Sequence, residues 1–88
     1  MKIAFLRHFY KDLKKITIES IKRDVADVII NTEKASKISE INNIKKLTGF
    51  KNAYRIKIGD YRIGIFIEND LVEFARLIHR KDIYKVFP

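Results

Sequence analysis

The spacing of hydrophobic residues changes from a helical to a strand period about halfway along the chain. Residues 1–6, MKIAFL, alternate between apolar and polar and predict a first β-strand. Apolar residues then recur at helical spacing between His8 and Ile16, which predicts an amphipathic helix. The polar face of this helix is expected to carry Lys11, Asp12, Lys14 and Lys15.

A second amphipathic helix is predicted after Thr17, which is a suitable N-cap residue. Its apolar face consists of Ile18, Ile21, Val25, Val28 and Ile29 and ends before Asn31 and Thr32. We expect the two helices to form a hairpin. Residues 33–53 are mostly polar and predict a loop, a short helical turn and a connector.

Three strands are predicted in the second half, over residues 53–58, 61–67 and 71–78. The short turns between them, at Gly59–Asp60 and at residues 68–70, predict an antiparallel meander. The third strand is almost wholly apolar and is expected inside the sheet, with residues 79–88 as a short terminal segment. The expected fold is α+β: an N-terminal strand, a helical hairpin on one sheet face, and an open opposite face.

The hairpin at residues 54–66, YRIKIGDYRIGIF, has a well-specified register. A two-residue turn predicts the pairs Ile58–Tyr61, Lys57–Arg62, Ile56–Ile63 and Arg55–Gly64. The face towards the helices is then formed by isoleucine and tyrosine, and the opposite face carries all three cations. A slip of one residue would bury these cations, so the register is fixed by the pattern.

Like charges that oppose each other across two strands are destabilising, on a scale of about 0.2–1 kcal/mol. The fold gives no reason to place Lys57 opposite Arg62, and Gly64 beside them would let a ligand approach the backbone. The pairing therefore favours a binding role. The alternative is that the cations only keep an exposed sheet face from aggregating.

Composition adds a constraint on the partner. The 88 residues predict one domain, residues 1–88, with 19 basic and 11 acidic side chains and a net charge of +8. Such a charge favours a polyanionic partner: a nucleic acid, an anionic membrane or an acidic protein. The sequence has no cysteine, no membrane-spanning run and no signal peptide, so we expect a cytoplasmic protein.

The C-terminal segment adds further candidates for a site that holds a phosphodiester. Arg76, His79, Arg80, Lys81, Tyr84 and Lys85 lie at the end of the last strand or just beyond it. If this segment returns beside the hairpin, fixed cations surround one depression and can stabilise a developing phosphorane. No carboxylate cluster or glycine-rich phosphate loop accompanies them, so no metal and no cofactor are expected. A lysine, tyrosine or histidine would then move the protons.

These stretches resemble a known family. The run IKKLTGFKNAYRIKIGDYRIGIF, followed by a hydrophobic strand that ends in HRKDIYKVF, is similar to the RelE/ParE superfamily of toxin–antitoxin toxins, on the RelE side. The resemblance covers essentially the whole chain, and its specific part is residues 44–87. It implies an α+β toxin that cleaves mRNA in the ribosomal A site without a metal.

The resemblance also implies roles for individual residues. Arg55 and Lys57 match the two basic residues of the first hairpin strand, with Lys57 as candidate base or charge stabiliser. Arg62 matches a phosphate-contacting arginine, Arg80 a phosphate stabiliser or acid, and Tyr84 a tyrosine that stacks on a base or shares in proton transfer. Position 55 is arginine where lysine is common, and arginine cannot act as a general base. That role would fall on Lys57, Tyr84 or His79.

The implied partners are a cognate antitoxin, mRNA and the ribosome. Two other functions remain open at this stage. One is a ParE-like toxin that inhibits DNA gyrase without cutting RNA. The other is a non-catalytic RNA-binding module, which the sequence disfavours because Phe66 is the one aromatic residue expected on the cationic sheet face.

Overall fold

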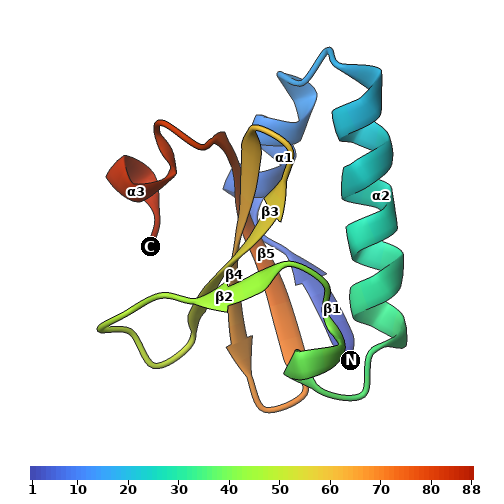
Figure 1. Cartoon of the computed structure of the whole chain (residues 1–88), viewed down its shortest axis with the longest axis vertical. Helices are drawn as coiled ribbons and strands as arrows, with labels where there is room; N and C mark the ends of the chain where they lie inside the picture. The colour runs from blue at the N-terminus through green and yellow to red at the C-terminus, as the bar shows by residue number, and fades with distance from the viewer.

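The computed structural model describes all residues, 1–88, as a five-stranded sheet with helices on both faces. In Figure 1, helix α2 stands on one side of the sheet and α3 on the other. The elements in chain order are β1 (Lys2–Phe5), α1 (Arg7–Lys14), α2 (Glu19–Lys34), the 3₁₀ turn η1 (Ile38–Glu40), β2 (Ile44–Lys46), β3 (Ala53–Ile58), β4 (Tyr61–Glu68), β5 (Leu71–His79) and α3 (Ile83–Val86). No helix is long and apolar enough to span a bilayer.

The strand order β1-β5-β4-β3-β2 confirms the predicted meander of β3, β4 and β5. Strand β1 lies parallel to β5, so the sheet is mixed and β5 is an interior strand, as its apolar sequence predicted. All four predicted pairs of the β3–β4 hairpin are present in the structure. The alternation of residue types was therefore sufficient to fix this register.

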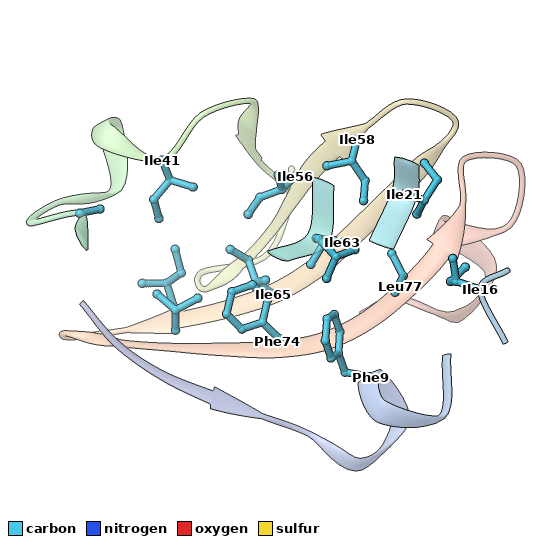
Figure 2. Packing of buried hydrophobic residues seen from close by; sticks show 14 residues of the cluster. Phe9, Ile16, Ile21, Ile41, Ile56, Ile58, Ile63, Ile65, Phe74 and Leu77 are labelled. Carbon is cyan, nitrogen blue, oxygen red and sulfur yellow. The ribbon is translucent and has the colours of Figure 1, made fainter. Parts of the chain in front are cut away.

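The main core lies between the sheet and the two N-terminal helices. Figure 2 shows its side chains, with Ile56 and Ile63 from the hairpin and Phe74 from β5 near its centre, all fully buried. Helix α1 contributes Phe9 and α2 contributes Val25. The hairpin face of isoleucine and tyrosine thus points to the helices, as expected.

A second, smaller core occupies the opposite face, which corrects the expectation that this face is open. Here the C-terminal segment packs onto the sheet through Ile83 and Phe87, against Leu47, Ala53 and Ala75. Ile83 and Phe87 lie four residues apart, so one helical turn presents both to the sheet. The tail is thus a docked element of the fold.

Several helix boundaries differ from those predicted. Helix α2 begins at Glu19 with Ile18 at the N-cap position, so Thr17 does not cap it, and it continues to Lys34, beyond Asn31. Its last carbonyls are bound by the amino group of Met1, which lies 2.6 Å from the carbonyl oxygen of Ala35 and 2.9 Å from that of Glu33. A positive group is favourable at this end of a helix, because the unpaired carbonyls carry partial negative charge.

Residues 33–53 contain the predicted short helical turn, η1, but also an edge strand that the sequence analysis missed. Strand β2 is only three residues long and pairs antiparallel with β3. Three residues are too few to establish a period of two.

Asp12 is buried, although helical spacing placed it on the polar face of the first helix. Strand β1 pairs with β5 only as far as Phe74, and α1 lies along β5 beyond that point. There the Asp12 carboxylate accepts hydrogen bonds from the backbone N–H of Leu77 at 3.0 Å and from Nε and Nη2 of Arg76 at 2.8 and 3.2 Å. Beyond the end of β1, the Asp12 side chain thus takes the place of a neighbouring strand at the edge of β5, and it anchors α1 there.

We expect Asp12→Ala to lower the free energy of unfolding by about 2–4 kcal/mol, measured by urea denaturation. The change leaves a buried N–H and a guanidinium without their acceptor, but Arg76 is partly exposed and regains water, so the loss falls below that of a fully buried pair. Glu19→Ala breaks an exposed ion pair with Lys22 and serves as the control, with an expected loss below about 1 kcal/mol. Equal losses in the two variants would contradict the anchoring role.

Candidate functional site

Four cations without an ion pair lie on the sheet face that points away from α1 and α2, which we call the cationic face: Lys45, Arg55, Lys57 and Arg62. The register places Lys57 directly opposite Arg62 and Lys45 directly opposite Arg55. Two like-charge pairs therefore stand side by side, where the sequence analysis had found one. Lys45 was missed because its position on this face follows only from the pairing of β2.

The two arginines of the cationic face are held by backbone carbonyls. Arg55 donates from Nη1 to the carbonyl oxygen of Asn43 at 3.2 Å. Arg62 donates from Nη1 to the carbonyl oxygens of Gly59 and Tyr61, both at 2.9 Å. None of the four forms an ion pair, so the guanidinium groups of Arg55 and Arg62 are restrained in position while their charge stays uncompensated.

Arg80 lies at the turn between β3 and β4. Its backbone N–H donates to the carbonyl oxygen of Asp60 at 2.7 Å, and its Nε lies 3.6 Å from Oδ1 of the same residue. More than half of the Arg80 side chain is exposed, so this ion pair is weak and the guanidinium can exchange it for a phosphate. The segment after β5 thus returns to the hairpin, beside the carbonyls that hold Arg62.

Tyr84 lies at the other end of β3, near the loop that joins β2 to β3. It projects from α3 with 64% of its surface exposed. It lines a hollow together with Leu47 and Phe50. The structure therefore brings Arg80 to the end of β3 and Tyr84 towards its start. Arg55 and Lys57 lie on β3 between these two ends.

The three secondary candidates are placed less favourably. Arg76 is bound on two nitrogens by Asp12. His79 pairs with Tyr61 and contacts its ring at 5.5 Å between centroids, so it lies on the helix side of the sheet. Lys81 donates its backbone N–H to Nδ1 of His79, and its side chain is exposed. Arg76 lies opposite Gly64, and so on the same sheet face as Arg55, but its charge is paired with Asp12.

Gly64 lies under an aromatic ring of this same chain, which corrects the expectation that it admits a ligand. A Cβ atom at Gly64 would lie 2.7 Å from the ring of Phe87, closer than such atoms approach each other. Strand β5 carries one extra residue, Ala75, opposite this point, and Ala75 also packs in the small core. The glycine is therefore required by the docking of the C-terminal segment.

Phe66 does not provide the stacking surface that the sequence suggested, because its ring is only partly exposed and packs against Phe87 at 5.1 Å between centroids. The exposed aromatic residues of this region are Tyr84 and Phe50, of which the sequence analysis missed the second. Phe50 follows Gly49 in a polar stretch, where no periodicity marks it as special.

Comparison with known proteins identifies the family. A family model described as the ParE toxin of the type II toxin-antitoxin system, parDE, matches residues 3–84. The curated protein Toxin RelE3 of Methanocaldococcus jannaschii is 38% identical over 89 residues, which cover 100% of both chains. These matches extend over nearly the whole of the described fold.

Solved structures have the same fold. The chain is similar to one in the crystal structure of the RelB–RelE antitoxin–toxin complex from Methanococcus jannaschii, with 37% identity, a TM-score of 0.78 and coverage of 97% of this chain and 99% of that one. The YoeB dimer from Staphylococcus aureus gives a TM-score of 0.72 at 12% identity, covering 90% and 95%. The archaeal RelE–RelB complex from Pyrococcus horikoshii gives 0.67 at 20%, covering 90% and 93%. The last two establish similarity of fold alone.

We expect Gly64→Ala to destabilise the protein by about 1–3 kcal/mol, because the new methyl group overpacks the ring of Phe87. Amide hydrogen exchange should accelerate in α3 before it does in β3. The same change is also made in a Phe87→Leu variant, which lacks the ring. In that variant Gly64→Ala should lower the free energy of unfolding by less than about half as much as it does in the wild type. An equal loss in both backgrounds would show that the strand itself, and not the docked ring, requires glycine.

Proposed function

Since the chain belongs to the RelE/ParE superfamily and is the toxin of a toxin–antitoxin system, we propose that it is a metal-independent endoribonuclease that cuts mRNA in the ribosomal A site. The observation that carries this proposal is the cationic face. It carries two pairs of opposed like charges, neither of which has a carboxylate partner, and such pairs weaken a sheet. Their positive charge is complementary to the negative charge of an RNA phosphodiester.

The proposed reaction needs only groups that this chain and its substrate supply. The 2′-hydroxyl of one nucleotide loses its proton and attacks the adjacent phosphorus. The bond from phosphorus to the 5′-oxygen then breaks, and that oxygen takes up a proton. The products are a 2′,3′-cyclic phosphate and a free 5′-hydroxyl. Fixed cations lower the barrier because the phosphorane between these states carries more negative charge than the substrate.

Each residue of the site receives a role in this proposal. Lys57 is exposed, forms no ion pair and faces Arg62, so it is our candidate for the proton acceptor or the main charge stabiliser. Arg55 and Arg62 bind the phosphate with guanidinium groups that backbone carbonyls already orient. Arg80 assists the leaving oxygen, and Tyr84 contacts the neighbouring base or shares in proton transfer.

We further propose that a cognate antitoxin binds this toxin in the cytoplasm, where the ribosomes are. The similar structure from Methanococcus jannaschii, which is 37% identical to this chain, is a complex of RelE with RelB. A net charge of +8 favours an acidic partner segment, and the unpaired cations offer it a binding surface.

Induced expression of the wild-type protein should arrest growth and produce new mRNA ends within codons, mapped by sequencing of 5′-hydroxyl ends. The double change Arg80→Gln with Tyr84→Phe should reduce cutting by at least about 10²-fold, because it removes a fixed charge and a hydroxyl from the transition state. Both side chains are exposed, so the thermal unfolding midpoint should stay close to that of the wild type.

Lys37→Gln is the matched control, since it removes an exposed charge from a loop outside the cationic face, and it should cut normally. Wild-type protein that leaves translated mRNA intact would overturn the proposed function. Inhibition of DNA supercoiling without loss of RNA would select the gyrase-directed alternative. If the double variant still cuts at the wild-type rate, the function stands and the assignment of these two residues is wrong.

A further inference from the structure

A hollow of about 330 Å³ lies beside the cationic face, where the β2–β3 loop meets the C-terminal segment. The six residues around it are Leu47, Thr48, Phe50, Tyr84, Phe87 and Pro88. Leu47 and Phe87 are buried and form its floor, whereas Phe50 and Tyr84 are 47% and 64% exposed and form its walls. The hollow is therefore an open slot with an apolar floor and an aromatic side chain from each of two segments.

The position of Phe50 is set by a tight turn. Gly49 adopts a φ of 88°, a left-handed conformation that strongly favours glycine, and the N–H of Phe50 returns to the carbonyl oxygen of Leu47 at 3.4 Å. The loop thus holds a large aromatic ring at the surface, where its burial contributes little to stability. This exposure points to a role in binding.

The chemistry of the slot matches an unpaired nucleobase. A base has two flat apolar faces, which stack on aromatic rings, and a polar edge, which hydroxyl groups can bind. The slot offers the rings of Phe50 and Tyr84 and the hydroxyls of Thr48 and Tyr84. None of the six side chains is acidic.

The register places this slot next to the proposed phosphate site. Leu47 lies opposite Ala53 at the start of β3, and the N–H of Leu47 donates to the carbonyl oxygen of Ala53 at 2.9 Å. Lys45 and Arg55, the next residues on the same face, are two positions further along, which is about 6.7 Å in a strand. One nucleotide can therefore set its phosphate on that cationic pair and its base in the slot.

We infer that the slot between Phe50 and Tyr84 binds one base of the RNA, and that Phe50 supplies a stacking wall that determines how the base sits. The inference rests on the proposed RNA substrate and deepens it. The resemblance implied base stacking for Tyr84 alone, whereas the second wall, the floor and the Thr48 hydroxyl come from the geometry of the β2–β3 loop.

The test compares two short fluorescein-labelled single-stranded probes by fluorescence anisotropy. One is a 2′-O-methyl RNA, which cannot be cut because its nucleophile is blocked, and the other is an abasic oligomer with the same backbone. Phe50→Ala should weaken binding of the first probe roughly 5- to 150-fold and leave binding of the abasic probe within about twofold. Phe50→Trp, which restores a stacking surface, should bind the first probe like the wild type.

Ile30→Ala is the control, since Ile30 is as exposed as Phe50 but lies on α2 on the other face of the sheet, and it should change neither affinity. Arg55→Gln should weaken both probes equally. The inference is overturned if Phe50→Ala weakens both probes equally, if it weakens neither, or if it weakens only the binding of the antitoxin. If the wild-type protein binds the base-containing probe more tightly than the abasic one but does not cut mRNA, the proposed nuclease activity is wrong and the base-binding slot stands.

Discussion

The contact between the ring of Phe87 and the bare backbone of Gly64 is the constraint on which the functional surface depends. A side chain at position 64 would lift the ring and with it the turn of helix that carries Tyr84. The contact buries Phe87 to 4% exposure and completes a small core that is separate from the main one. Glycine lowers the strand propensity at this position, but it leaves room for the ring of Phe87 and so fixes the tail over the sheet.

The two parts of the site are held by different forces. Arg55, Lys57 and Arg62 stand on a sheet whose register the main core and the hydrogen-bond ladder fix together. Tyr84 and Phe50 are held by a four-residue helix and a glycine turn over a core of five buried residues. The electrostatic part is therefore preorganised by the whole fold, and the aromatic part by local packing. A change in the tail should disturb base contacts before it disturbs phosphate contacts.

Much of the fold could be predicted because the hairpin has two chemically pure faces. A period of two over residues 54–66 leaves one register that buries every isoleucine and no cation, and the structure has that register. The same reasoning failed wherever a position depends on a partner far along the chain. Asp12 looks solvent-exposed on a helical wheel, and only the exposed edge of β5 beyond Phe74 explains its burial. The docking of Phe87 and the pairing of Lys45 likewise depend on tertiary contacts, which no local sequence pattern indicates.

The candidate site was predictable where it lies on the hairpin and was not predictable where two segments meet. Backbone carbonyls at turns carry enough partial charge to hold Arg55 and Arg62 in place without neutralising them, and such carbonyls leave no mark in the sequence. A carboxylate in the same place would be visible in the sequence, but it would cancel the charge that binds a phosphate. Neutral acceptors therefore restrain Arg55 and Arg62 and leave their charge free for the proposed polyanion, and for that reason this part of the geometry has to be read from the structure.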